Sequence, residues 1–272
     1  MTRVRYGARS LAEMTNREVE ATSVDTWATT LVATYQSDPE AVAAVLPPPL
    51  VAPAEPLVRV TVATVDVGRG YGIFGAGTFA VHCRYEDTDG DYALVMPMTT
   101  EQATIGGRET FGEPKKIADI VLDRDGDKVR GAFTRMGTTF LEVAGEIESE
   151  VEPAPDRVRS SFYLKFLPSP TGKGFDGDPL LVHVQRRERT RHQWRVRGEV
   201  ILRESRFDPV VDLPVRQLVD IELAERTSLQ TGEVVAHLPA DWIAPFAHQR
   251  YDDLSPLGAE TAETAETAET EG

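Results

Sequence analysis

The chain has 272 residues, of which 41% are hydrophobic, and its formal net charge is −15 at pH 7. This length and composition are ordinary for a soluble globular protein with a substantial core, whereas the acidic balance argues against binding to nucleic acid or to an anionic membrane surface. The single cysteine, Cys83, excludes an internal disulfide framework and a cysteine-rich metal site. We therefore expect a cytoplasmic protein without a signal peptide or a membrane span.

The chain divides into three predicted parts. Residues 1–22 form an N-terminal segment, and residues 23–257 contain no Gly/Ser-rich linker and no break in composition, which favours one domain. Residues 258–272 repeat Ala-Glu-Thr and contain five glutamates with nothing to bury. Such a segment is predicted to be a disordered acidic tail.

Within the domain, the first predicted element is a helix that begins at Pro39, with Ser37 or Asp38 as its N-cap, and ends at the prolines 47–49. A second helix is predicted after Pro239. Between them, alternation of apolar and polar residues dominates, as expected for strands. Many short strands with few helices predict a mainly β protein, a closed or nearly closed antiparallel β-barrel with a few short flanking helices. The predicted strands are 57–67, 78–86, 92–98, 128–136, 139–148, 160–167, 180–188, 193–202 and 215–225.

Several short motifs favour structural roles. The segment "GYGIFG" (70–75) runs into a strand, so it predicts a glycine-rich hairpin and not a dinucleotide site. The acidic segments 87–91 and 123–127 lack calcium-loop spacing and predict Asp-Gly hairpin turns. The arginine-rich run 186–191 predicts a solvated strand end or an ion-paired subunit surface. The histidines lack ligand spacing, so we expect no metal site.

One dibasic pair stands out from this background. Only five of the 29 basic residues are lysines, and two of them, Lys115 and Lys116, are adjacent in "GRETFGEPKKIADIVLD". Arginine cannot lose its proton and attack a carbonyl, but lysine can when a neighbouring cation or burial favours the neutral amine. The pair thus predicts either a nucleophilic lysine or a solvated dibasic turn.

The segment "GRETFGEPKK" resembles the lysine signature of the acetoacetate decarboxylase superfamily. The segments "AVLPPPL", "EPLVRV", "GDYALVM", "YLKFLPSPTG", "DLPV" and "RYDDL" resemble family segments in the same order, over most of residues 35–254. The resemblance implies a β-barrel with a buried site and a homo-oligomer. It also implies that Lys115 is the Schiff-base lysine and that Lys116 is its cationic neighbour.

The sequence departs from the decarboxylase pattern at three positions that precede this signature in the chain. The decarboxylase itself uses an arginine near its N-terminus and two glutamates ahead of the lysine pair, and the corresponding positions here are Ala28, Thr61 and Ala76. These changes put acetoacetate decarboxylation in doubt and favour the superfamily members that keep the lysine but change its surroundings. The retained polar residues are Glu101, Arg108, Glu109 and Tyr251.

The predicted function is a Schiff-base lyase acting on a small keto acid, by decarboxylation or by aldolase-dehydratase chemistry. Lys115 would form the imine, and the catalytic set would also include Lys116. Arg108 would bind substrate or order the loop, and Glu101 would bind substrate or transfer a proton. Glu109 and Tyr251 are the further candidates for proton transfer. No metal and no organic cofactor is needed, because the imine is the electron sink. The alternative is a barrel that binds a small metabolite without turning it over.

Overall fold

The computed structural model describes residues 4, 6–12, 27–66 and 72–252, so the predicted acidic tail lies outside the described ranges. The described chain is mainly β, as predicted. Its strands are β1 (Trp27–Gln36), β2 (Leu57–Asp66), β3 (Ile73–Tyr85), β4 (Thr88–Met98), β5 (Lys115–Ile117), β6 (Asp119–Asp125), β7 (Lys128–Arg135), β8 (Thr138–Val151), β9 (Arg157–Lys165), β10 (Leu180–Leu202) and β11 (Gln217–His237). Its helical segments are α2 (Pro39–Ala44), α3 (Glu101–Phe111), η1 (Val210–Asp212), α4 (Ala240–Ile243) and η2 (Ala244–Gln249).

A closed barrel forms the centre of the fold. Its strands follow the order β11-β1-β2-β3-β4-β9-β10, and β10 pairs back onto β11 to complete the ring. The predicted closed barrel is therefore confirmed. One joint differs from the antiparallel pattern, because β4 and β9 run parallel, with Asp91 opposite Ser161.

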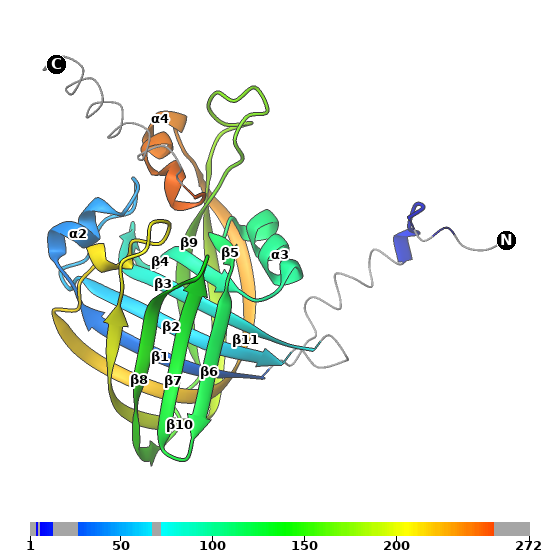
Figure 1. Cartoon of the computed structure of the whole chain (residues 1–272). Helices are drawn as coiled ribbons and strands as arrows, with labels where there is room; N and C mark the ends of the chain where they lie inside the picture. Colours follow the sequence, from blue (N-terminus) through cyan, green and yellow to red (C-terminus); the bar gives the residue numbers. More distant parts are fainter. Residues whose placement is uncertain (1–3, 5, 13–26, 67–71, 253–272) are drawn as a thin grey trace, which may run out of the picture.

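A second layer covers part of the barrel. Strands β8, β7 and β6 continue the sheet from β10 and lie across β2 and β3 (Figure 1). Because successive strand residues face opposite sides, one face of β1–β3 lines the barrel interior and the other packs against this layer. The main hydrophobic core lies between the layers, where Phe79, Phe133 and Phe140 are buried. The Phe133 ring occupies the space that a side chain at position 77 would need, so Gly77 permits the close approach.

Strand β10 belongs to both layers. The two predicted strands 180–188 and 193–202 form one strand of 23 residues. Its first part pairs with β9, and its last part pairs with β8. The pairing with β11 is irregular between Thr190 and His192, at the point where the two predicted strands were separated.

The helices follow the predicted boundaries in two places. Helix α2 begins at Pro39 with Asp38 as its N-cap, although the Asp38 carboxylate binds the Arg216 guanidinium at 2.9 and 2.6 Å and makes no cap bond. The segment after Pro239 forms α4 and then η2, which begins at Ala244 and has Pro245 in its first turn.

The two Asp-Gly segments behave differently. Segment 123–127 forms the predicted hairpin turn between β6 and β7, with Gly126 at φ +60°. The prediction for 87–91 was wrong, because the turn lies at Glu86 and Asp87, and Gly90 is buried in β4 against Phe162. Phe162 requires the space there, so this glycine is a packing residue.

Within the described ranges, no helix is long and apolar enough to cross a membrane.

Candidate active site

The lysine pair follows a helix that sequence patterns alone did not reveal. Helix α3 begins after Thr100, whose side chain accepts a hydrogen bond from the Ala103 amide at 3.4 Å, and ends at Gly112 in the left-handed conformation at φ +80°. Only glycine adopts this conformation without strain. The chain then turns directly into β5, where Lys115 pairs with Met96 of β4.

Two arginines fix this turn. Arg108 donates from Nη1 to the carbonyl oxygens of Lys115 at 2.9 Å and Arg250 at 3.3 Å. Arg250 in turn donates to the carbonyl oxygens of Gly112 at 3.0 Å and Leu164 at 2.9 Å. These buried charge-assisted hydrogen bonds connect α3, β9 and the C-terminal segment. Arg108 therefore contacts the lysine loop through main-chain oxygens, and both of its predicted roles, in binding substrate or in ordering the loop, stay predictions.

The Lys115 amine lies against a buried carboxylate. Its Nζ is 2.7 Å from Oε2 of Glu113, and the side chains are 14% and 2% exposed. The other oxygen, Oε1, accepts a hydrogen bond from Nε2 of Gln230 at 3.1 Å, and Oε1 of Gln230 accepts one from Arg186 at 3.1 Å. A chain of polar contacts thus runs from Lys115 across the barrel to Arg186.

Glu113 was missing from the predicted site. It lies inside the quoted signature, two residues before the lysine, and this position is the signal that sequence analysis could have used. Gln230 lies in the part of β11 beyond the last predicted strand, so its partnership with Glu113 depends on barrel closure.

Helix α3 approaches the Lys115–Glu113 ion pair closely at Gly107. A Cβ atom at this position would lie 2.0 Å from Oε2 of Glu113 and 2.5 Å from Nζ of Lys115. The adjacent Gly106 has open space around it. Gly107 therefore provides the space that the Lys115–Glu113 ion pair occupies, whereas Gly106 does not.

Lys115 and Glu113 face a cavity of about 270 Å³ inside the barrel. The cavity wall has both apolar and polar residues. The apolar residues include Ala63, Ala80, Ala93, Met96 and Met98, and the polar residues include Arg59, Asp91, Arg159, Tyr163, Arg186 and Glu188. The three positions at which the sequence departs from the decarboxylase pattern also line this cavity: Ala28, Thr61 and Ala76.

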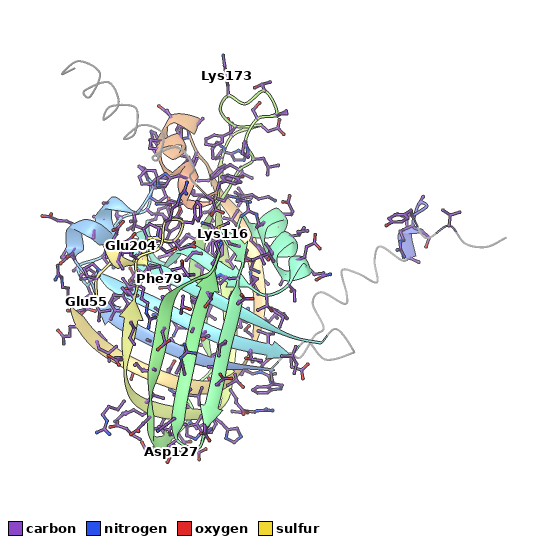
Figure 2. All side chains as sticks on the ribbon, viewed as in Figure 1. Glu55, Phe79, Lys116, Asp127, Lys173 and Glu204 are labelled. Carbon is purple, nitrogen blue, oxygen red and sulfur yellow. The ribbon has the colours of Figure 1, made fainter. Side chains whose placement is uncertain are left out.

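Lys116 binds a different set of groups. Its Nζ lies 3.1 Å from Asp252 and 3.5 Å from Asp208, and Arg135 pairs with both carboxylates. Figure 2 shows Lys116 between Lys173 at the top of the view and Asp127 at the bottom. Two carboxylates balance the charge of Lys116, so its predicted role as the cation that activates Lys115 has little geometric support.

We expect Lys116→Gln to destabilise the fold. The change removes one cation from a network in which the Asp208 side chain is 2% exposed. Arg135 remains to pair with this carboxylate, so the expected loss in the free energy of unfolding is about 1–3 kcal/mol. Thermal melting measures it, and Lys116→Arg, which keeps the charge, is the matched control. An unchanged melting temperature in the glutamine variant would contradict the structural role.

The same network predicts a pH dependence. Burial opposes ionisation of Asp252, but Arg135 and Lys116 outweigh it and hold the pKa of this carboxyl below its usual range. A lowered folded-state pKa adds stability above the unfolded value of about 3.9 and loses it as the pH falls through the folded value. The difference in melting temperature between wild type and Lys116→Gln should therefore shrink below about pH 4.

The remaining predicted residues separate into two groups. The Arg108 guanidinium lies over the Tyr251 ring, with its Cζ atom 5.3 Å from the ring centre. Tyr251 also lines a second cavity of about 570 Å³, which reaches Lys115 and Lys116. Glu101 and Glu109 are exposed on α3 and line neither cavity. The structure thus brings Arg108 and Tyr251 to the lysine pair but leaves both glutamates outside.

The structure corrects another prediction, which concerns the arginine-rich run 186–191. Arg186 and Glu188 line the barrel cavity, whereas Arg187 between them is exposed. The predicted solvated strand end is therefore wrong for Arg186 and Glu188, whose side chains face the cavity.

Among the described residues, no group of His, Cys, Asp and Glu side chains is arranged to hold a metal ion.

The described structure is thus a closed barrel in which a lysine and a buried carboxylate face an interior cavity. The model of the acetoacetate decarboxylase family matches residues 11–238, and the chain belongs to this family. Acetoacetate decarboxylase of Bordetella avium (strain 197N) is 30% identical over 214 residues, which cover 75% of this chain and 84% of the relative. That of Burkholderia cenocepacia (strain HI2424) is 28% identical over 215 residues, with 75% and 85% covered.

Solved structures share the fold. Acetoacetate decarboxylase from Legionella pneumophila superposes with a TM-score of 0.69 at 21% identity, covering 79% of this chain and 86% of that chain. The enduracididine biosynthesis enzyme MppR, complexed with the condensation product of pyruvate and imidazole 4-carboxaldehyde, gives a TM-score of 0.65 at 15% identity, covering 78% and 88%. At these identities the likeness concerns the fold alone.

Proposed function

We propose that this protein is a Schiff-base lyase that acts on a small keto acid. The observation that supports it most is the Lys115 amine, which lies 2.7 Å from the buried Glu113 carboxylate at the wall of the barrel cavity. A nucleophilic lysine needs a group that accepts its proton and a site that excludes bulk water. Membership of the acetoacetate decarboxylase family supports the same class of reaction.

In the proposed reaction, neutral Lys115 attacks the keto carbon of the substrate, so that a C–N bond forms. Glu113 carries two protons in turn from the nitrogen to the former keto oxygen, the first from the ammonium group of the resting ion pair and the second from the attached amine. The oxygen then leaves as water, which breaks the C–O bond and gives the iminium with one proton on nitrogen. The iminium then accepts the electron pair of an adjacent bond. That bond is a C–C bond in decarboxylation or retro-aldol cleavage, and a C–H bond in dehydration.

Borohydride trapping tests this proposal. The protein is incubated with α-keto and β-keto acids, reduced, and digested for mass spectrometry, and we expect a reduced adduct on Lys115. Analysis of released products then distinguishes loss of carbon dioxide from aldol or dehydration chemistry. Binding of the acids without any adduct would instead favour a non-catalytic metabolite-binding barrel.

The Glu113 carboxylate should be necessary for rapid imine formation. Glu113→Gln keeps the shape and the contact with Gln230 but cannot take a proton, so we expect the rate of adduct formation to fall by about 10²-fold. Glu109→Gln is the comparison, because Glu109 is an exposed acid of the same signature that lines neither cavity. A large loss in the Glu109 variant together with an active Glu113 variant would reverse the assignment.

A further inference from the structure

We propose that the substrate carries a second carboxylate, which binds in the barrel interior at Arg186 and Arg159 and remains in the product. This inference rests on the proposed function, because it identifies the class of substrate for the same cavity. It follows from the balance of charge inside the barrel, from the partners of Arg186 and from the place of both arginines relative to Lys115.

The cavity holds more cations than anions. The Lys115–Glu113 pair balances itself. Of the remaining charged groups on or directly behind the described cavity wall, the arginines outnumber the carboxylates by two. The arginines are Arg59, Arg157, Arg159, Arg186 and Arg226, and the carboxylates are Asp91, Glu188 and Glu222.

The surplus lies at one place. Arg59 pairs with Asp91, and Arg226 pairs with Glu222. Glu188 is shared, because its Oε2 accepts from Arg157 at 2.9 Å and from Arg159 at 3.1 Å. Despite the opposing effect of burial, Arg159 and Arg157 hold the pKa of Glu188 below its usual range. Arg157 also lies 3.9 Å from Glu222, so Glu188 is the one carboxylate that pairs with Arg159 and is shared there.

Arg186 has only a neutral partner in the described part of the chain. Its Nη2 donates to Oε1 of Gln230 at 3.1 Å, and it forms no ion pair with a described carboxylate. Burial opposes the charge of this partly buried guanidinium, whereas Tyr163 and Glu113 act from a distance and the pKa of Arg186 is raised overall. Anionic charge therefore surrounds Arg186, but no described carboxylate binds it directly. Its planar donor fork fits a carboxylate with two parallel hydrogen bonds.

Arg159 lies next to Arg186. The two residues are directly opposite each other in the β9–β10 pairing, and both line the cavity. Burial, followed by repulsion from Arg59, lowers the pKa of Arg159. An anion beside Arg159 would offset this repulsion from Arg59, and Arg186 lies directly opposite on the neighbouring strand, so the two arginines form a site for a carboxylate.

This anion site and the lysine share one cavity. Gln230 contacts both Arg186 and Glu113, so a single side chain connects the arginine site to the carboxylate beside Lys115. A volume of about 270 Å³ equals that of roughly nine water molecules in the liquid. This is suitable for a five- or six-carbon oxo acid that reaches Lys115 with its keto group and the arginines with its far end.

The arginine-bound carboxylate should be retained in the reaction. Loss of carbon dioxide moves the negative charge of the leaving carboxylate into the carbon skeleton, and an arginine paired with that group would lose its counter-ion in the transition state. The arginines would then stabilise the ground state more than the transition state and slow the step. The carboxylate at Arg186 is therefore a binding group, and the bond that breaks lies nearer the lysine.

Matched oxo acids test the inference. The probes are 2-oxopentanoate with 2-oxoglutarate and 3-oxopentanoate with 3-oxoglutarate, which differ only in a terminal methyl or carboxylate. We expect half-saturation of borohydride trapping at a concentration at least 10-fold lower for the dicarboxylate of a pair. Arg186→Gln should remove this preference, whereas Arg187→Gln, the exposed neighbour on the same strand, should keep it.

The outcomes separate this inference from the proposed function. Equal trapping of both members of each pair by the wild type overturns the dicarboxylate inference and leaves the Schiff-base function intact. If no acid is trapped, calorimetric binding of the dicarboxylates to wild type and to Arg186→Gln still tests the anion site. A dicarboxylate preference that survives in Arg186→Gln, or an absence of dicarboxylate binding, overturns the inference. If Arg186→Gln does not fold, the wild-type comparison decides.

Discussion

Lys115→Arg is expected to abolish imine formation while the protein remains folded. Arginine keeps the positive charge beside Glu113, but its guanidinium stays protonated at every accessible pH and cannot attack a carbonyl. Removal of the nucleophile in a covalent enzyme costs on the order of 10⁴-fold or more in rate. Borohydride trapping and product formation measure the loss, and circular dichroism reports the fold.

The same substitution elsewhere is the control. Lys128 is an exposed lysine at the start of β7, distant in the fold from the lysine loop, so Lys128→Arg should leave trapping unchanged. Lys116→Arg should also retain substantial activity, because its charge and its carboxylate partners remain. A trapped adduct in Lys115→Arg, at the wild-type level, would show that the nucleophile is another residue.

Gly107→Ala is expected to inactivate the protein without unfolding it. The new methyl group would overlap Oε2 of Glu113 and Nζ of Lys115, which are the ends of flexible side chains and can rotate away. Their displacement costs little stability but breaks the 2.7 Å contact that the proposed reaction uses. A shift of about 1 Å in a reacting group can cost about 10²-fold in rate, and we expect a loss of this size in adduct formation.

Gly106→Ala is the matched control on the same helix. An alanine at this position meets nothing within 4 Å, and alanine favours a helix over glycine by roughly 0.5–1 kcal/mol. We therefore expect unchanged trapping and a slightly higher melting temperature. If both variants lose activity equally, the effect would come from the helix backbone and not from crowding of the ion pair.

The fold class was predictable because the alternation of apolar and polar residues in strands is a local pattern of the sequence. Period-2 alternation identified the strands whose two faces differ, as in β2, with buried valines at 58, 60 and 62. Barrel closure itself was inferred from the number of strands. Helix α3 was missed because Gly106 and Gly107 lower helix propensity in its centre, while the tertiary contact at Gly107 requires a glycine. Strand β1 was missed because its alternation is weak.

The site was predictable only in part for a related reason. The lysine loop is one continuous segment, so Lys115, Arg108 and the signature around them could be identified together. The partners from other strands could not, because the facing of Arg186 and Gln230 depends on strand register and on barrel closure. An arginine that lines a cavity has the same local sequence pattern as one in solvent. The exposure of Glu101 and Glu109 likewise depends on how α3 docks.

Closure of the barrel between β1 and β11 also determines when the site comes into existence during synthesis. Trp27 pairs with Thr227, two hundred positions later in the chain, so the ring cannot close until nearly the whole domain has left the ribosome. Gln230 arrives with that last strand and completes the contacts of Glu113. The lysine is thus enclosed late, and an incomplete nascent chain lacks the walled cavity in which the amine would react with cellular carbonyl compounds.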